Sequence, residues 1–155
     1  MRTADRLLVL GGVLTAGVAL LHIGIIIGGP DWYRFFGAGE RMARMAARGS
    51  MQPALVTASI AAILAVWALY AFSGAGVIRR LPFLRVALTL VAAVYLARGL
   101  FGVPVVMLVD DVYTKQLRAK LTFMVVSSAI CIVLGVCYAI GAAQASKAAP
   151  ALRPE

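Results

Sequence analysis

Charged residues are scarce in this sequence. Of its 155 residues only 14% are charged, and 6 acidic residues stand against 15 Lys and Arg. Soluble domains carry about 25% charged residues and disordered chains are poor in apolar ones, so the composition excludes a soluble enzyme and a disordered chain. The hydrophobic set makes up 63% of the chain and the mean hydropathy is +0.95. These values indicate that lipid is the solvent for most of the protein surface.

Cysteine and histidine are also rare. The chain has 2 cysteines, both inside apolar runs, and 1 histidine. This excludes a disulfide scaffold and a cysteine-rich metal site, and one chain cannot supply two histidine ligands to a haem. The adjacent carboxylates of Asp110 and Asp111 lack further oxygen ligands nearby, so we interpret them as a solvated helix end rather than a cation site. We therefore expect no metal and no cofactor.

Four apolar segments are long enough to cross a bilayer, because about 20 helical residues span about 30 Å of hydrocarbon. They cover residues 7–29, 53–72, 86–109 and 121–141. The first exceeds the usual apolar region of a signal peptide and ends in Ile-Gly-Gly-Pro without a cleavage site, so we interpret it as a membrane helix. The sequence predicts one integral membrane domain, an all-α transmembrane four-helix bundle. Residues 142–155, rich in Ala and Pro, are expected to form a flexible tail.

The segment between the first two spans has an amphipathic pattern. Arg41, Arg44 and Arg48 recur at spacings of three and four, which places them on one helical face, and Trp32 and Tyr33 precede them. Aromatic residues followed by a basic helix are typical of an element that lies in the headgroup layer. The net charge of +9 also favours lipid headgroups over nucleic acid, so membrane lipids are the expected partners.

Four spans place both chain ends on one side of the membrane. The positive charges near the spans number about seven on each side, so the positive-inside count is tied. The Arg79–Arg80 turn lacks acidic neighbours, which favours termini on the cytoplasmic side of a bacterial inner membrane. In the first span Gly17, Gly24 and Gly28 share one face, which predicts close helix packing or a homo-oligomer through that face.

Arg98 is the most informative residue because it lies near the middle of the third span. A guanidinium there costs from about 2.5 to about 17 kcal/mol unless it finds a partner, and no acidic residue occurs in any of the four spans. Three partners are open. Arg98 can bind backbone carbonyls exposed near Pro104, a loop carboxylate such as Glu40 or the Asp110–Asp111 pair, or an anionic ligand held by two hydrogen bonds.

His22 and Arg98 are predicted to lie at a similar depth. From the terminal side, His22 lies about 24 Å and Arg98 about 18 Å across the membrane at 1.5 Å per residue. We therefore expect a polar pocket formed by Arg98, His22, Tyr95 and Glu40. The alternatives are a histidine hydrogen-bonded within the bundle and a surface pair between Glu40 and Arg44, four residues apart.

Two short motifs carry a family resemblance. The run Glu40–Arg48 with Pro53-Ala, and the run Leu96-Ala-Arg-Gly99, resemble the arginine motifs of the membrane-associated eicosanoid and glutathione (MAPEG) family. That family's asparagine and glutamate are replaced here within the range 49–51. The four-span layout also resembles DoxX-like bacterial proteins, and the run 32–40 resembles an uncharacterised bacterial membrane family, which implies no activity.

Three functions remain open. The unpaired Arg98 favours a non-catalytic membrane protein that binds a lipid or an amphipathic anion in an intramembrane pocket. The MAPEG resemblance implies instead a transferase or isomerase that acts on a lipophilic substrate, binds glutathione and forms a trimer. The glycine face of the first span indicates a scaffold or accessory subunit of a membrane complex. The sequence is therefore compatible with both an enzymatic and a non-enzymatic function.

Overall fold

The computed structural model describes residues 3–148, and the side chains of residues 3–145 within them. This part of the chain is helical, without strands. Its helices are α1 Thr3–Phe35, α2 Glu40–Ala47, α3 Gln52–Gly74, α4 Leu84–Leu108, α5 Val112–Arg118 and α6 Leu121–Ala148. The four long ones, α1, α3, α4 and α6, are long and apolar enough to span a membrane. The predicted all-α class and the four predicted spans are confirmed.

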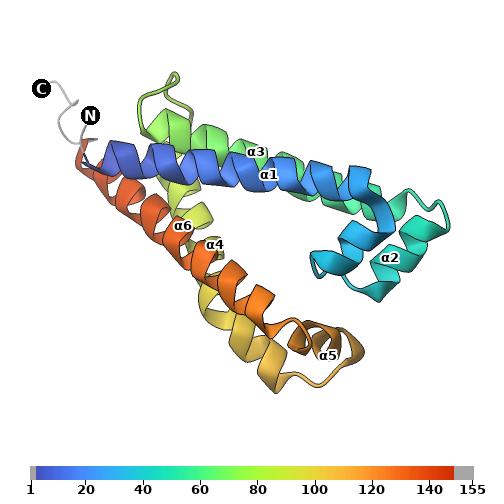
Figure 1. The fold of residues 1–155 in the computed structure, drawn as a ribbon. Helices are drawn as coiled ribbons and strands as arrows, with labels where there is room; N and C mark the ends of the chain where they lie inside the picture. Colours follow the sequence, from blue (N-terminus) through green and yellow to red (C-terminus); the bar gives the residue numbers. More distant parts are fainter. Residues whose placement is uncertain (1–2, 149–155) are drawn as a thin grey trace, which may run out of the picture.

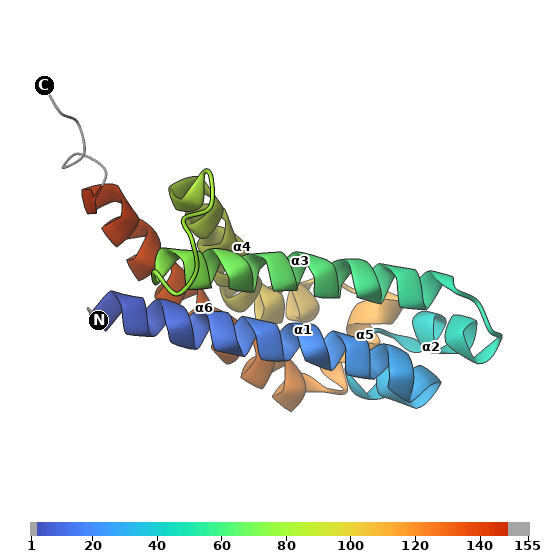
Figure 2. The same ribbon diagram turned by 90° about the horizontal axis from the view of Figure 1, so that it is seen from above.

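The long helices form two antiparallel pairs arranged as a V (Figures 1 and 2). α1 lies along α3 in one arm and α4 lies along α6 in the other. The arms meet at the end that holds the N-terminus and the end of α6, and they diverge toward α2 and α5. Large apolar side chains cover the outside of all four long helices, which suits contact with lipid.

Small residues bring the helices of each arm into close contact. A Cβ added at Gly135 on α6 would lie 2.6 Å from Leu96 Cγ on α4, and one added at Gly99 would lie 3.0 Å from the Ser128 carbonyl oxygen. In the other arm, a Cβ at Gly12 would lie 2.9 Å from the Phe72 ring. Backbones that approach this closely gain van der Waals contact, the main force between helices in lipid.

A buried hydroxyl cluster joins all four long helices where the arms meet. The hydroxyls of Tyr95 on α4 and Tyr138 on α6 both lie 3.2 Å from Thr15 Oγ1 on α1. Tyr138 also donates to the carbonyl oxygen of Trp67 on α3 over 3.1 Å. Because that carbonyl accepts and Tyr138 has a single hydroxyl proton, Thr15 donates to Tyr138 while it accepts from Tyr95.

Thr15→Val should loosen this junction. Valine keeps the shape of threonine but leaves the Tyr95 hydroxyl without the only partner the described residues give it, so we expect a loss of about 1 kcal/mol in the free energy of unfolding. The measurement is unfolding in mixed micelles, followed by circular dichroism. Thr122→Val is the matched control, because Thr122 is exposed on α6. Equal stability of the two variants would show that the cluster contributes nothing.

The helix ends differ from the predicted spans. α1 continues to Phe35, but Gly29 breaks its helical geometry with φ 68° and ψ −151° just before Pro30, so the last turn bends away from the helix axis (Figure 1). α6 continues to Ala148, so residues 142–148 are helical where the sequence predicted a flexible tail. The rest of that tail lies outside the described residues.

α5 is a short helix that the sequence did not predict. Its N-cap is Asp111, whose carboxylate accepts a 2.7 Å hydrogen bond from the Thr114 amide, while the Thr114 hydroxyl bonds the Asp111 backbone. This reciprocal capping box stabilises the first turn. The hydrogen bond from Thr114 holds the pKa of the Asp111 carboxyl below its usual range. The predicted solvated helix end at Asp110–Asp111 is therefore the start of another helix.

Candidate functional site

A cavity of about 770 Å³ lies where the two arms diverge. Its wall includes residues of α1, α3, α4, α5 and α6. Most of the lining is apolar, including Phe36, Ile60, Phe101, Val105, Phe123 and Met124. This volume falls within the range of about 300–1,000 Å³ that is usual for small-molecule sites. Arg98 and His22 line it from α4 and α1, and the other polar residues of its wall are Asp111, Tyr113 and Thr114 at the α5 side.

Gly102 makes room for the Arg98 side chain. The guanidinium lies over Gly102, one turn along α4, and a Cβ at that position would collide with Nη1 of Arg98 and lie 3.1 Å from Ser128 Oγ. Nη1 donates to Ser128 Oγ over 3.4 Å, which is long for a hydrogen bond. A guanidinium has five N–H donors, so this one contact leaves most of its capacity unused.

The acidic side chains that the sequence suggested as partners of Arg98 bind other groups instead. Glu40 pairs with Arg34 at 2.9 Å, Asp110 pairs with basic side chains of α5 at 3.6 Å, and Asp111 caps α5. None of the ion pairs among residues 3–148 includes Arg98, and none of its hydrogen bonds there reaches a backbone carbonyl. Of the three predicted partners, an anionic ligand is the one these contacts leave open.

His22 reaches the same cavity from α1. Its Nδ1 lies 2.8 Å from the Val18 carbonyl oxygen, so Nδ1 carries the proton and donates it to this bond. The side chain is half-buried, and Nε2 has no hydrogen-bond partner among the described residues. The backbone bond is the one that the alternative interpretation of His22 expected. It also fixes the tautomer, which leaves the Nε2 lone pair available.

Tyr95 does not belong to the cavity. It is buried, with 6% of its surface exposed, and its hydroxyl bonds Thr15 at the junction of the arms. Its ring contacts those of Trp67 and Tyr138 at centroid distances of 5.3 and 5.8 Å. The structure therefore separates Tyr95 from Arg98, although the sequence placed them in one pocket.

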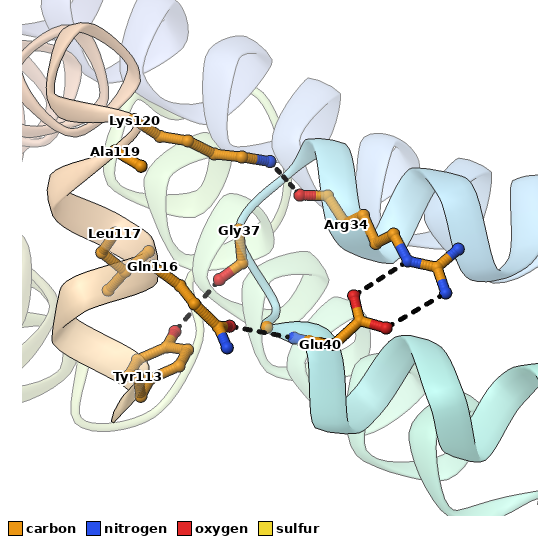
Figure 3. A pocket seen from close by; sticks show the side chains of 9 residues that line it. Arg34, Gly37, Glu40, Tyr113, Gln116, Leu117, Ala119 and Lys120 are labelled. Atoms are coloured by element: carbon orange, nitrogen blue, oxygen red, sulfur yellow. Dashed lines mark hydrogen bonds and ion pairs between the residues drawn. The ribbon is translucent and has the colours of Figure 1, made fainter. Parts of the chain in front are cut away.

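Glu40 lies at the wide end of the V, beyond the cavity. Its carboxylate accepts two hydrogen bonds from Arg34, at 2.9 Å from Nε and 3.2 Å from Nη2 (Figure 3). It also lies 3.7 Å from Arg44, the pair that the sequence offered as an alternative. The Arg34 guanidinium holds the pKa of the Glu40 carboxyl below its usual range. Glu40 is thus committed to Arg34 and does not meet Arg98.

Arg34→Gln should raise the pKa of Glu40 toward its ordinary value, as followed by the NMR shift of the Glu40 carboxyl carbon. Because folding lowers this pKa, the pair stabilises the fold fully above the unfolded-state value. Its contribution declines below that pH and disappears once the pH passes the lowered folded-state value. Asp31 also binds Arg34, at 2.9 Å, so Asp31→Asn is introduced both in the protein that keeps Arg34 and in the Arg34→Gln variant, and the comparison then reports on Glu40 alone. An unchanged titration would contradict the pairing.

Three side chains, which we call the latch, connect the far ends of the two arms (Figure 3). Tyr113 donates to the Gly37 carbonyl over 3.1 Å, and Gln116 Oε1 accepts from the Glu40 amide over 3.1 Å. Lys120 donates to the carbonyls of Arg34 and Phe35 at the end of α1, where the last helix carbonyls carry partial negative charge. The latch lies next to the cavity, because Gly37 and Tyr113 form one of its hydrogen bonds and also line the cavity.

The basic face of α2 agrees with an element at the membrane surface. Arg41, Arg44 and Arg48 are all exposed, and Arg48 is the residue that follows the helix. Tyr33 behaves differently from the prediction, because it is 2% exposed and packs in a small core with Ile25 beneath α2. The sequence gave no sign of this burial, which follows from the bend in α1.

Trp32 covers part of the glycine face of α1. Its indole contacts Gly28 and lies 3.4 Å from the position of a Cβ on Gly24, whereas a Cβ on Gly17 would meet nothing within 4 Å. Trp32 therefore covers two of the three glycines, Gly24 and Gly28, within the same chain. A homo-oligomer through this face stays a prediction that concerns Gly17.

No protein-family model, characterised protein or solved structure matches the chain. The fold defines a helical membrane protein with four candidate spans, and the site is a cavity between two diverging helix pairs. Among residues 3–148, no three His, Cys, Asp or Glu side chains gather as a metal site requires.

Proposed function

We propose that this protein binds a lipid or an amphipathic anion in the cavity between its two arms, with Arg98 holding the acidic group. One observation carries the proposal. Arg98 lies within a spanning helix, and among the described residues its guanidinium has only a 3.4 Å bond to Ser128. An unpaired guanidinium in hydrocarbon costs about 2.5 kcal/mol or more. A carboxylate or phosphate with two hydrogen bonds to the guanidinium would offset this cost.

The composition of the cavity supports an occupant with one acidic end and an apolar body. Phe101 and Val105 continue the apolar wall along α4 next to Arg98. Asp111 is the acidic residue that lines the cavity, and its carboxylate already accepts from Thr114. A cationic ligand would meet the charge of Arg98, whereas an anionic one would neutralise it.

We further propose that the protein resides in a bacterial cytoplasmic membrane with both termini inside. The exposed Arg79 and Arg80 between α3 and α4 would then face the cytoplasm. The basic face of α2 and the indole of Trp32 would lie in the opposite headgroup layer, where aromatic and basic side chains concentrate.

The test is native mass spectrometry of gently extracted wild-type protein and Arg98→Ala. We expect a discrete acidic ligand on the wild type and its loss from Arg98→Ala, because a bond to a charged group contributes about 1.5–3 kcal/mol, or about tenfold or more in affinity. Arg41→Ala is the control, since it removes an exposed surface charge of α2. A wild type without ligand, or a ligand retained by Arg98→Ala, would contradict the proposal.

A further inference from the structure

We infer that the occupant of the cavity is a single-chain lipophilic carboxylic acid. This inference rests on the proposed function and names the ligand class for the same site. Three features carry it: the size of the cavity, the depth of the Arg98 guanidinium, and the free nitrogen of His22.

The size of the cavity suits one chain. A volume of about 770 Å³ lies within the range of about 300–1,000 Å³ that is usual for sites of drug-sized molecules. A two-chain phospholipid is much larger than such a molecule, and its headgroup would need space of its own. Apolar side chains such as Phe101 and Val105 line the cavity beside Arg98, and a single hydrocarbon chain can lie against them.

The depth of the guanidinium selects the acidic group. It lies over Gly102, which is six residues and therefore about 9 Å before the end of α4 at Leu108. The latch lies at the wide end of the V, and its Gly37 and Tyr113 form part of the cavity wall. An acidic group must therefore enter apolar surroundings to reach Arg98. A carboxylic acid can do so in its neutral form, whereas a phosphodiester remains charged.

His22 can take the proton that such an acid releases. The O–H bond of the acid breaks, the proton forms an N–H bond at Nε2 of His22, and the carboxylate pairs with the Arg98 guanidinium. Nδ1 of His22 keeps its own proton in the bond to the Val18 carbonyl, so the imidazole becomes cationic. The total charge in the cavity is unchanged by this step, which limits the electrostatic cost of binding in lipid.

The experiment compares probes on the full-length protein in discs of phosphatidylcholine after removal of co-purified lipid. The probes are hexadecanoic acid, hexadecan-1-ol and dihexadecanoyl phosphatidic acid, each titrated by native mass spectrometry. We expect the acid to bind at least about tenfold more tightly than either other probe, because only it combines one chain with a charge-assisted bond to Arg98. The NMR shift of its labelled carboxyl carbon should report the ionised form.

Two variants locate the binding. Arg98→Gln should weaken hexadecanoic acid by about tenfold or more, and His22→Gln should leave the bound acid in its protonated form because an amide does not accept the proton. The probe comparison on the wild type remains decisive if a variant fails to fold.

The outcomes separate this inference from the proposed function. Preference for phosphatidic acid that depends on Arg98 would overturn the ligand class and leave the proposed function standing. A bound hexadecanoic acid that stays protonated on the wild type would overturn the transfer to His22. If no probe binds, or if binding ignores Arg98→Gln in a folded variant, both the inference and the proposed function are wrong.

Discussion

Gly135→Leu is expected to separate α6 from α4 and to lower the free energy of unfolding by about 3 kcal/mol or more. A Cβ at this position would lie 2.6 Å from Leu96 Cγ and 3.0 Å from the Leu96 backbone nitrogen. The side chain of Leu96 can rotate away, but its backbone can move only if the two helices move apart. Helix contact at small residues is the main stabilising force in lipid, so this separation removes much of the arm's stability.

The matched control is Gly17→Leu on α1. A Cβ at Gly17 would meet nothing within 4 Å, and the residue is exposed. We therefore expect no loss of stability, and at most a gain of about 1 kcal/mol from the better helix propensity of leucine, in unfolding followed by circular dichroism in mixed micelles. If Gly135→Leu unfolds like the wild type, the close packing of α4 and α6 is wrong. A loss in Gly17→Leu accompanied by the loss of an oligomer would place a second copy on this face.

Gly102→Ala is expected to weaken ligand binding by about tenfold or more while leaving the charge of the site unchanged. The added Cβ would collide with Nη1 of Arg98, so the guanidinium must leave its place beside Ser128. Alanine is a better helix former than glycine, by about 1 kcal/mol, so α4 itself should not be destabilised by the change. The ligand affinity should therefore fall, while the free energy of unfolding stays the same or rises.

Ligand retention by native mass spectrometry measures this effect, and unfolding in mixed micelles measures the stability of the same variant. Gly17→Ala serves as the matched control, because the same substitution there adds a Cβ that meets nothing within 4 Å and lies outside the cavity. Full ligand retention in Gly102→Ala would mean that the position of the guanidinium does not matter for binding.

The four spans could be predicted from hydropathy because the cost of exposing polar groups to lipid depends on composition and length alone. The ends of the helices could not. The bend at Gly29 and Pro30 redirects the last turn of α1, which buries Tyr33 and lays Trp32 over Gly28. These contacts depend on one backbone conformation that a hydropathy pattern does not record.

The levels of the site residues along their helices could be predicted from the sequence, but the side chains that face the cavity could not. His22 and Arg98 line one cavity, and the rise per residue along a helix was sufficient to place them at similar levels. Tyr95 lies one turn closer to the junction of the arms, where α4 still packs against other helices. The angle between the arms decides where the cavity begins, and the sequence carries no direct signal for that angle.

The contacts at the wide end were missed because they join distant or irregular positions. Glu40 and Arg34 are 6 residues apart, a spacing that does not bring two side chains together on one helix. They meet because the chain turns between them, with φ 79° at Gly37 and 91° at Gly39. α5 is too short for periodicity to be informative. The residues Asp111 and Thr114 at N-cap and N3 were its only local signal, and they resemble a capping box.

Photolabelling in native membranes tests most directly whether a ligand binds between the two arms. A single-chain acid and a phosphatidic acid, each with a diazirine near the end of a chain, are crosslinked to wild-type protein and to Arg98→Ala, and the labelled peptides are mapped. We expect one of these probes to label cavity residues such as Phe123 and Met124 in the wild type and to lose that labelling in Arg98→Ala. Labelling confined to outward residues such as Leu20 and Ile27, with the same pattern in both proteins, would contradict this expectation.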